Sequence, residues 1–188
     1  MFILNDDQIR ERIEAGMIDP AEMSSVRTGV ISYGVTSFGY DMRVANEWQL
    51  WSVESARTID PKRNDLHKQL ATFVQSSIRI PPNEFALCRS VEYFKIPDDV
   101  LCIVVGKSTY ARCGLVVNCT PLEPGWEGHV TIELSNTAPL PIKVYANEGI
   151  AQVLFFQGKR PRKTYADKKG KYQGQQGITL PRIEGGNA

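Results

Sequence analysis

The sequence predicts a mainly β fold, either an all-β sandwich or a jelly-roll barrel, preceded by one helix. Apolar, β-branched runs of about five to eight residues recur along the chain, and Gly, Pro, Asn and Asp separate them, as in proteins built from many short strands. Near the N-terminus, one segment has the apolar spacing of an amphipathic helix instead. With 188 residues, 42% of them hydrophobic, the chain is long enough for one compact domain over residues 1–188.

The predicted helix lies close to the N-terminus. Residues 5–7, Asn-Asp-Asp, are of the types that cap helices. Ile9, Ile13 and Met17 follow at four-residue intervals, so one face of the helix is apolar, and we expect the helix to end near Gly16.

The predicted strands occupy most of the remaining chain, and one or two helices are expected within residues 61–72. The strand-like runs are residues 39–51, 58–61, 71–82, 85–99, 100–106, 114–119, 128–136, 141–149 and 150–156.

Residues 159–188 differ in composition from the rest of the chain. Their first part, KRPRKTYADKKGKYQGQQG, is polar and basic and has no apolar face to bury, so on its own it should be a mobile tail. The alternative is a flap that orders over a bound anion. Tyr165 would then supply an aromatic ring, and Lys171, Gln175 and Gln176 would supply hydrogen-bond donors.

Composition and charge argue against several classes of protein. The net charge of +1 provides no general attraction for a nucleic acid polymer. The start, MFILNDDQIRER, has too few apolar residues for a signal peptide, and no later run has the length of a membrane span, so we expect a cytoplasmic protein without membrane contact.

The cysteines and histidines do not form a zinc-binding pattern. There is no C-x-x-C pair, only two histidines are present, and the H-x-E…P-C-x-x-C signature of zinc deaminases is missing. The cysteines lie in apolar, strand-like surroundings, which predicts buried free thiols and a reducing compartment. They are Cys88, Cys102, Cys113 and Cys119.

The stretch VVGKSTYARCGL contains Gly-Lys-Ser-Thr, the end of a P-loop motif. A P-loop has another glycine five positions before Gly106, and Leu101 stands there, so the backbone cradle for phosphates is missing. A lysine, two hydroxyls and an arginine still stand together after a predicted strand, and this is anion-binding chemistry. They are Lys107, Ser108, Thr109 and Arg112.

A glutamate on the predicted strand 128–136 is a candidate for proton transfer. His129, Thr131 and Glu133 share one face of that strand, and the apolar residues between them share the other. Apolar neighbours would partly desolvate Glu133 and raise its pKa toward the range useful for acid–base catalysis. The same pattern also fits an ordinary exposed strand glutamate.

Taken together, these motifs resemble the dCTP deaminases, the metal-independent branch of the trimeric dUTPase superfamily. In the family's order, the chain contains SYGVTSFGYDMRV, GKSTYARCG, TPLEPGWEGHVTIELSNTAPLP, EGIAQVLFF and KYQGQQG, and the likeness runs from about residue 2 to residue 183. The resemblance implies a distorted jelly-roll or β-barrel of the dUTPase-like type, with an N-terminal helix and a C-terminal flap at 159–188. It also implies a homotrimer with sites between subunits.

The reaction that the resemblance implies is hydrolytic deamination of dCTP to dUTP and ammonia, which supplies dUTP for dUMP and thymidylate synthesis. Glu133 would take a proton from the water that attacks C4 of cytosine and would protonate N3. Arg112 would balance Glu133 or the attacking water, and Ser108 would bind near the reacting centre or a phosphate. Mg²⁺ would bridge triphosphate oxygens, held mainly by phosphate and water, and no zinc is implied.

The resemblance also implies a wider set of substrate contacts. Glu123 stands where many relatives have an aspartate that contacts the sugar 3′-hydroxyl. Trp126 either packs beside the sugar or belongs to the core, and for Asp41 a structural hydrogen bond is favoured over a magnesium contact. The implied substrate-binding residues are Lys107, Ser108, Thr109, Tyr110, Ala111, Arg112, Glu123, Thr131, Ile132, Glu133, Gln152, Tyr165, Lys171 and Gln175.

Two other functions remain open at this point. A dUTPase, or a bifunctional deaminase that continues to dUMP and diphosphate, would fit the same fold. A dUTPase normally has Gly-x-Ile-Asp-x-Gly-Tyr and a terminal glycine-rich motif with phenylalanine, where this chain has LEPGWEG and KYQGQQG. A non-catalytic nucleotide-binding module is the third possibility, against which the presence of Glu133, Ser108 and Arg112 argues.

Overall fold

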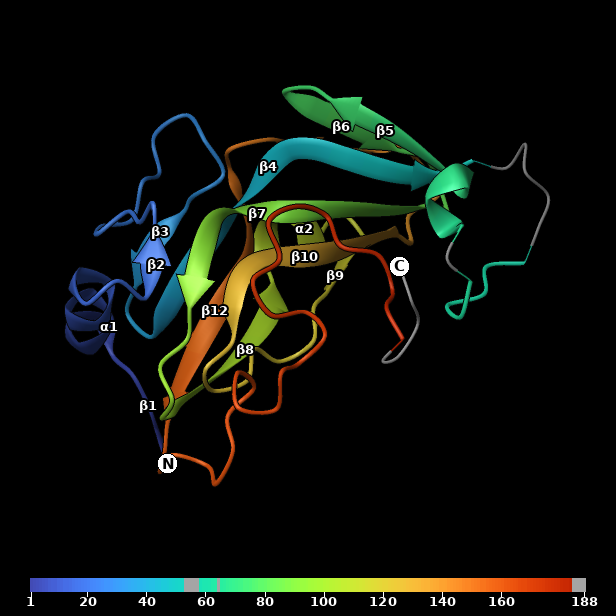
Figure 1. Ribbon diagram of the computed structural model, residues 1–188. Coiled ribbons are helices and arrows are strands. Elements are labelled where there is room, and N and C mark those ends of the chain that lie inside the picture. The colour runs from blue at the N-terminus through green and yellow to red at the C-terminus, as the bar shows by residue number, and fades with distance from the viewer. Residues whose placement is uncertain (53–57, 64, 184–188) are drawn as a thin grey trace.

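The computed structural model describes residues 1–52, 58–63 and 65–183, and strands dominate it (Figure 1). The mainly β architecture is therefore confirmed. Its helices are α1 (Asp6–Glu14), the 3₁₀ helix η2 (Leu66–Gln69) and α2 (Ser108–Ala111). Its strands are β1 (Phe2–Ile3), β2 (Ile18–Asp19), β3 (Gly34–Thr36), β4 (Gly39–Trp51), β5 (Leu70–Val74), β6 (Ser77–Ile80), β7 (Phe85–Lys95), β8 (Val100–Gly106), β9 (Leu115–Asn118), β10 (Glu127–Asn136), β11 (Ile142–Tyr145) and β12 (Gly149–Gln157).

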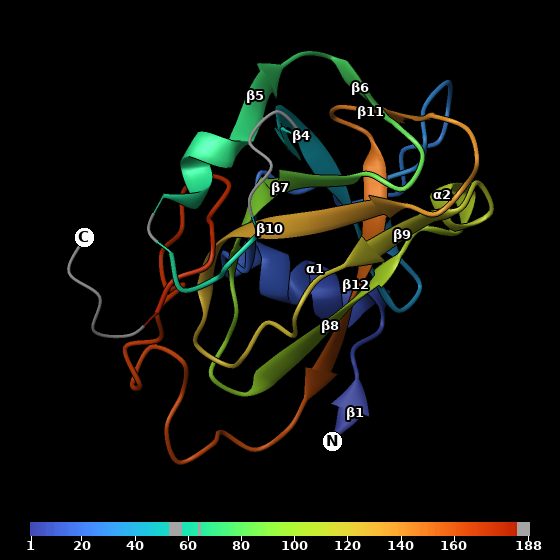
Figure 2. The same ribbon diagram turned by 90° about the vertical axis from the view of Figure 1, so that its right-hand side faces the viewer.

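Most strands belong to one sheet that curls into a half-barrel (Figures 1 and 2). Its main path runs β1-β12-β4-β7-β10-β9, with β2, β3, β5 and β8 attached at the sides. The long strand β4 causes the curl, since its first half pairs with β12 and its second half pairs with β7 and β5. The register of β4 against β7 shifts between Val44 and Trp48, and such an irregularity bends and twists a strand. Strands β6 and β11 form a separate pair.

The hydrophobic core fills the inside of this curl. Alternate residues of β10 are buried, and so are the inward residues of β7 and β12, because successive side chains of a strand point to opposite faces. The largest fully buried side chains include Trp48, Tyr40, Phe94, Phe155, Ile132 and Leu134.

The N-terminal helix α1 confirms the first sequence prediction. Asn5 is its N-cap and forms a capping box with Gln8, in which each side chain accepts from the other residue's backbone N–H. Ile9 and Ile13 are its buried residues. The helix ends just before Gly16, whose positive φ of 92° suits a residue without a side chain.

Three expectations between residues 58 and 82 need correction. The run 58–61 is not a strand, because Asp60 accepts hydrogen bonds from the N–H groups of Lys62 and Arg63 and so forms a turn. The run 71–82 is divided between β5 and β6, which pair with different strands. The helix expected within 61–72 is the single-turn η2, and residue 64 of that range lies outside the described residues.

The cysteines are free, and their burial differs from the expectation at one position. Cys88 and Cys102 are buried, as predicted, and Cys119 is half-buried. Cys113 is exposed, since it lies in the turn after α2 and not in a strand. In the described part of the chain, no helix is long and apolar enough to span a membrane.

Candidate active site

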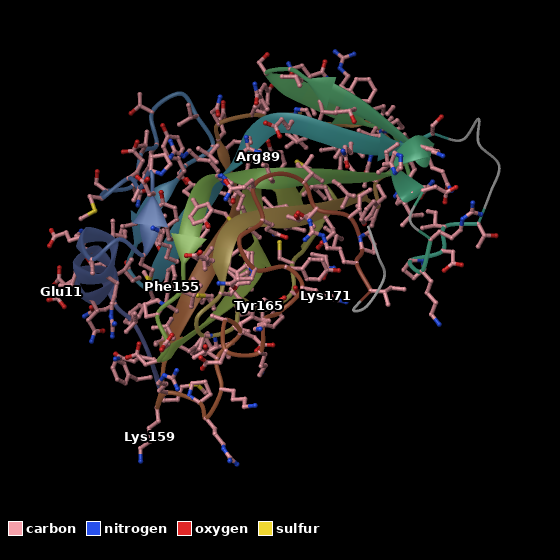
Figure 3. All side chains as sticks on the ribbon, in the orientation of Figure 1. Glu11, Arg89, Phe155, Lys159, Tyr165 and Lys171 are labelled. Carbon is pink, nitrogen blue, oxygen red and sulfur yellow. The ribbon has the colours of Figure 1, made fainter. Side chains whose placement is uncertain are left out.

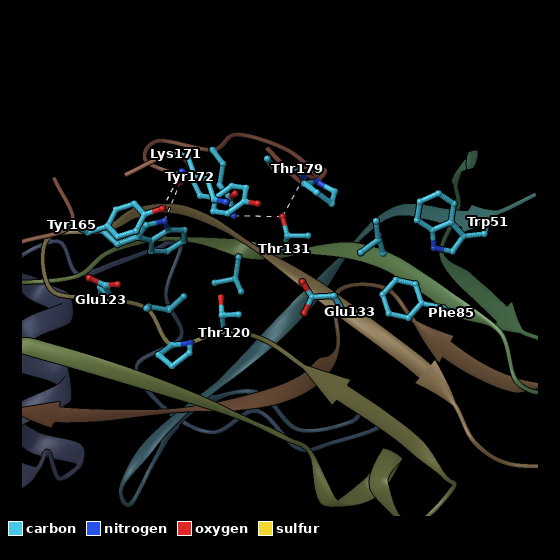
Figure 4. Close-up of a pocket in the computed structure, with 17 residues that line it drawn as sticks. Trp51, Phe85, Thr120, Glu123, Thr131, Glu133, Tyr165, Lys171, Tyr172 and Thr179 are labelled. Carbon is cyan, nitrogen blue, oxygen red and sulfur yellow. Dashed lines mark hydrogen bonds between the residues drawn. The ribbon is translucent and has the colours of Figure 1, made fainter. Parts of the chain in front are cut away.

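A pocket of about 600 Å³ lies between β10, the turn that precedes it and the C-terminal tail (Figure 4). The residues that line it come from β4, β7, β10, the segment 120–126 and the tail, so the pocket depends on parts of the chain that are distant in sequence. They are Trp51, Phe85, Leu87, Thr120, Pro121, Leu122, Glu123, Trp126, Val130, Thr131, Glu133, Tyr165, Lys171, Tyr172, Gln175, Thr179 and Pro181.

Glu133 occupies the central part of this pocket wall. It lies on the solvent-facing side of β10, between two buried residues, as the period-two pattern predicts. Its carboxylate accepts a long hydrogen bond of 3.4 Å from Asn118 Nδ2 on β9. Burial raises the pKa of Glu133 to about 7, and a backbone hydrogen bond opposes this effect only in part. Glu133 forms no ion pair with any residue that the structure describes.

A carboxyl group with a pKa near neutrality can work in both directions of proton transfer. Its two protonation states are similarly populated at pH 7, so the same side chain can accept a proton from water and later return it to a substrate atom. A glutamate with an ordinary pKa would be almost wholly ionised and a poor proton donor. The desolvation of Glu133 thus gives this carboxyl group a pKa suited to general acid–base chemistry.

The turn before β10 supplies the opposite end of the pocket. Glu123 is half-buried, and its carboxylate accepts from Lys168 Nζ at 3.1 Å. Trp126 is 5% exposed and packs in the core, which agrees with the core role considered for it, and it also lines the pocket. Its Nε1 donates to the carbonyl of Tyr172 at 3.0 Å and thereby holds the tail.

The C-terminal tail folds back along β10 and does not extend into solvent (Figure 1). The N–H of His129 donates to the carbonyl of Gln175 at 2.9 Å, and the N–H of Gly174 donates to the carbonyl of Glu127 at 2.9 Å. Gln175 Nε2 donates to the carbonyl of His129 at 2.6 Å. The expectation of a mobile tail is corrected for residues 159–183, because hydrogen bonds dock the tail and Tyr165 packs against the hydrophobic core. Residues 184–188 of the predicted tail lie outside the described residues.

Thr131 is the side chain on β10 where two parts of the tail meet. Its Oγ1 accepts from Gln175 Nε2 at 3.4 Å and from the N–H of Thr179 at 3.1 Å (Figure 4). Because Thr131 and Glu133 share one face of the strand, this hydroxyl couples the position of the tail to the wall that carries the carboxylate.

Two glycines make this close docking possible. A Cβ on Gly128 would come within 2.9 Å of Gln175 Cγ, and its φ of +148° is one that other residues rarely adopt. A Cβ on Gly170 would lie 2.2 Å from the ring of Tyr165. The tail therefore needs glycine at one of its own positions and at one position of the strand that receives it.

Tyr165 and Lys171 lie close together on the side of the molecule that the tail covers (Figure 3). The hydroxyl of Tyr165 accepts from the N–H of Tyr172 at 3.0 Å, and Lys171 Nζ donates to the carbonyl of Arg182 at 2.9 Å. Both side chains line the pocket, together with Gln175, so the structure brings three predicted tail residues to the same pocket as Glu133.

The second predicted group, residues 107–112, lies outside this pocket. These residues form the corner where β8 ends and α2 begins, which we call the α2 corner. Ser108 and Arg112 are exposed, whereas Tyr110 is buried and its hydroxyl accepts from the N–H of Tyr145 at 3.0 Å. Thr109 and Ala111 are exposed as well.

Lys107 at the α2 corner is bound within its own chain. Its Nζ pairs with the carboxylate of Asp41 on β4, and the side chains of Lys107 and Asp41 are only 10% and 9% exposed. This contact agrees with a structural role for Asp41. Gln152, which lies opposite Asp41 in the sheet, donates from Nε2 to Thr36 Oγ1 at 3.0 Å and is also outside the pocket.

Ile132 was predicted from the sequence to bind substrate, but its side chain is fully buried, so only its backbone can face a ligand. Several other residues line the pocket and were not singled out from the sequence. Trp51 and Phe85 form an apolar wall on the Glu133 side of the pocket (Figure 4), together with Leu87, which pairs with Glu133 across the sheet. Thr179 and Pro181 also line the pocket, beyond the predicted Gln175 in the chain. The period-two alternation of residues 85–95 places Phe85 and Leu87 on one face, but no sequence pattern indicates which strand pairs with β10.

A family model described as dCTP deaminase-like matches residues 3–158. The chain belongs to this family. It is 58% identical over 184 residues to a protein from Acidobacterium capsulatum named dCTP deaminase, a match that covers 97% of this chain and 100% of the relative. A protein of the same name from Erythrobacter litoralis is 58% identical over 185 residues, with 97% and 100% covered.

A solved structure shares the fold of this family member. The crystal structure of 2′-deoxycytidine 5′-triphosphate deaminase from Agrobacterium tumefaciens matches with a TM-score of 0.65 at 17% sequence identity. The match covers 84% of this chain and 48% of the other, so the present chain spans about half the length of that protein. At this identity the likeness shows the fold alone, which is the dUTPase-like type that the sequence motifs predict.

Proposed function

We propose that this chain is a dCTP deaminase, which converts dCTP and water to dUTP and ammonia. The proposal depends mainly on one observation: Glu133 is a half-buried carboxyl group with a pKa near 7, and it lies in a pocket that the tail partly covers. The relatives that match almost the whole chain are named dCTP deaminases. The product dUTP would supply dUMP and thymidylate synthesis, and we expect the enzyme to act in the cytoplasm.

The proposed reaction begins with water near C4 of the cytosine ring. Glu133 accepts a proton from the water as its oxygen bonds to C4, and the carboxyl group then protonates N3. The tetrahedral intermediate loses its amino group as ammonia, after a further proton transfer through Glu133, and the C4–O bond becomes a carbonyl. A positioned acid–base group of this kind contributes roughly 10² to 10⁴ in rate.

Substrate placement in the pocket follows from the positions of its polar groups. Glu123 lies at the opposite end from the apolar wall and would contact the sugar 3′-hydroxyl, next to Tyr165. Lys171 and Gln175 on the tail would reach the triphosphate. The backbone of Thr131 and Ile132 would read the base, since the Ile132 side chain faces the core.

Within the described residues no cationic side chain forms an ion pair with Glu133, and we propose that the α2 corner of a neighbouring copy supplies one. Ser108 and Arg112 are exposed on the α2 corner and do not reach Glu133 within one chain. Val105 and Val116, on the strands that flank the corner, are 40% and 50% exposed, an apolar surface that a second copy can cover. We therefore propose a homotrimer in which each site combines Glu133 of one chain with Ser108 and Arg112 of the next.

The triphosphate would bring Mg²⁺ with it. Within the described residues no group of three or more His, Cys, Asp or Glu side chains could hold a metal ion. A magnesium ion bound mainly by phosphate oxygens and water fits this protein surface. When bound, the ion would neutralise phosphate charge, and all proton transfers at C4 and N3 would remain with Glu133.

The reaction is tested by incubating the purified protein with dCTP and Mg²⁺, measuring ammonia and separating the nucleotides by anion-exchange chromatography. We expect ammonia and dUTP in equal amounts. Ammonia with dUMP and diphosphate would instead establish the bifunctional alternative, and nucleotide binding without ammonia would leave a binding module.

The composite site is tested by mixing inactive variants. Co-expressed Glu133→Gln and Arg112→Ala chains should recover activity at about a quarter of the sites, since each site takes one residue from each of two chains. The matched control is Ser108→Ala with Arg112→Ala, in which no chain has an intact α2 corner, so no activity should return. Equal results in both mixtures would contradict the composite site.

A further inference from the structure

The apolar wall beside Glu133 has no part in the reaction described so far. A row of side chains crosses the sheet on the pocket side, in which Gln49 of β4 lies opposite Leu87 of β7, and Leu87 lies opposite Glu133. Asn118 of β9 lies opposite Glu133 on its other side. Directly paired residues of antiparallel strands place their side chains next to each other on one face. Glu133 is therefore flanked by a polar amide on one side and by an apolar side chain on the other.

Leu87 is the residue of this row that can keep water from the carboxylate. It is only 6% exposed although it lines the pocket, and Phe85, on the same face of β7, extends the apolar surface. Burial is the dominant cause of the raised pKa of Glu133. An apolar partner cannot donate a hydrogen bond to the carboxylate, so it disfavours the ionised form.

No charge from the surrounding elements of the described chain compensates Glu133. On β7, Arg89 faces Thr131 and is held by both carboxylate oxygens of Glu47, at 3.0 and 2.7 Å. After β9, the Cys119 thiol has its pKa raised by burial and stays neutral. The other charged pocket residues form no ion pair with Glu133, since Lys171 Nζ donates to the carbonyl of Arg182 and Glu123 pairs with Lys168. The remaining residues considered around Glu133 are uncharged, namely Gln49, Asn118, Thr179 and Pro181.

We propose that Leu87 is a positioning residue for the deamination, which sets the pH at which Glu133 exchanges protons by covering one side of its carboxyl group. The catalytic part of this inference rests on the proposed function. The effect of Leu87 on the protonation of Glu133 does not depend on that function. In the proposed homotrimer, Arg112 of the neighbouring chain favours the ionised form of Glu133, whereas Leu87 favours the protonated form. The carboxyl group then stays able to give a proton as well as take one.

The experiment compares three variants of the full chain by two readouts. Leu87→Asn replaces the apolar group with an amide of similar size, and Leu87→Met keeps an apolar side chain. Ile142→Asn is the matched control, because Ile142 is 7% exposed and lies on β11, in the other sheet. The first readout is the ¹³C NMR titration of δ-carbon-labelled glutamate, in which Glu133→Gln identifies the Glu133 signal. The second is the pH dependence of kcat/KM for dCTP.

In Leu87→Asn, we expect the midpoint of the Glu133 titration and the acidic limb of kcat/KM to move down by about one pH unit. Both should stay at the wild-type position in Leu87→Met and Ile142→Asn. An unchanged midpoint in Leu87→Asn overturns the proposal. If Leu87→Asn does not fold, Leu87→Ala, which admits water beside the carboxylate, must lower the midpoint for the proposal to stand.

The two readouts separate this inference from the proposed function. If the Glu133 midpoint moves in Leu87→Asn but the wild type releases no ammonia from dCTP, the role of Leu87 is supported and the deaminase function is rejected. If the wild type deaminates dCTP but the midpoint does not move in Leu87→Asn, the deaminase function is supported and the role of Leu87 is rejected.

Discussion

Glu133 in the pocket and Lys107 at the α2 corner are two charged side chains that the chain holds in opposite ways. Lys107 is almost fully covered and has a carboxylate partner, Asp41, within its own chain. Glu133 is covered on one side, its carboxylate accepts from the amide of Asn118, and it has no ion-pair partner among the described residues. A buried charge with a partner contributes to structure, whereas a partly buried charge without one changes its proton affinity and becomes reactive. The phosphate contact that the sequence motif implies for Lys107 would require this ion pair to open.

The largest expected effect is on turnover at the pocket. Glu133→Gln keeps the size of the side chain but cannot carry a proton between water and the base, so kcat should fall by roughly 10² to 10⁴. Binding of dCTP, measured by calorimetry, should persist. Glu127→Gln, on the same face of β10, is the control and should retain activity. Substantial turnover in Glu133→Gln would remove Glu133 from the mechanism.

The next effect concerns the ion pair at the α2 corner. Asp41→Asn leaves Lys107 buried without a counter-charge, and the free energy of unfolding should fall by about 3 to 5 kcal/mol. Urea unfolding measures this change. The control, Asp98→Asn, breaks the exposed pair with Arg160 and should cost about 1 kcal/mol or less. Similar losses in the two variants would mean that Lys107 needs no internal partner.

A smaller effect is expected where the tail meets β10. Thr131→Val removes the hydroxyl that accepts from Gln175 and Thr179, while Thr131→Ser keeps it. Two hydrogen bonds of about 0.5 to 1.5 kcal/mol each amount to about 1 to 3 kcal/mol together, which corresponds to a rise in the KM for dCTP of about 5- to 150-fold. Limited trypsin digestion at the lysines of the tail should accelerate in Thr131→Val only. Equal digestion of both variants would show that the backbone bonds suffice to dock the tail.

The smallest effect is a pH-dependent gain of stability in Glu133→Gln. The folded-state pKa of Glu133, about 7, lies above its ordinary value of 4.5, so the folded wild type loses stability as pH rises from about 4.5 to 7. Glutamine does not ionise, so the variant should be more stable than the wild type at pH 8. We expect a difference of about 1 to 2 kcal/mol, which is smaller than the full pKa shift would give, because water still screens the partly exposed carboxylate. At pH 4.5 the difference should vanish. A constant difference between urea midpoints at the two pH values would contradict the raised pKa.

Local patterns predicted local structure well. The helix α1 follows from its cap and its four-residue apolar spacing, because both act within one or two turns. The face on which Glu133 lies follows from strand alternation alone. The turn at Asp60 was missed because a side chain that accepts from the backbone outweighs the β propensity of a short run.

The tail shows where a criterion based on hydrophobicity fails. Residues 159–177 have no apolar stripe, and their composition predicted mobility. They are docked mainly by hydrogen bonds to backbone groups, from the backbone and from side chains such as those of Gln175 and Trp126, and Tyr165 packs against the core. Backbone groups have no signature in the sequence. Gly128 and Gly170, which allow the close approach, could have suggested that another segment packs there.

By itself, the sequence determined the type and approximate position of the longer elements, the face of its strand on which Glu133 lies and, through its ordered motifs, the family, whereas the short strands β1, β2 and β3 were not predicted. Only the tertiary structure decided that Leu87 and Asn118 flank Glu133, that Lys107 pairs with Asp41, and that the α2 corner lies outside the pocket. The reason is that strand alternation is a property of each strand, whereas the pairing of strands depends on contacts between residues far apart in the chain.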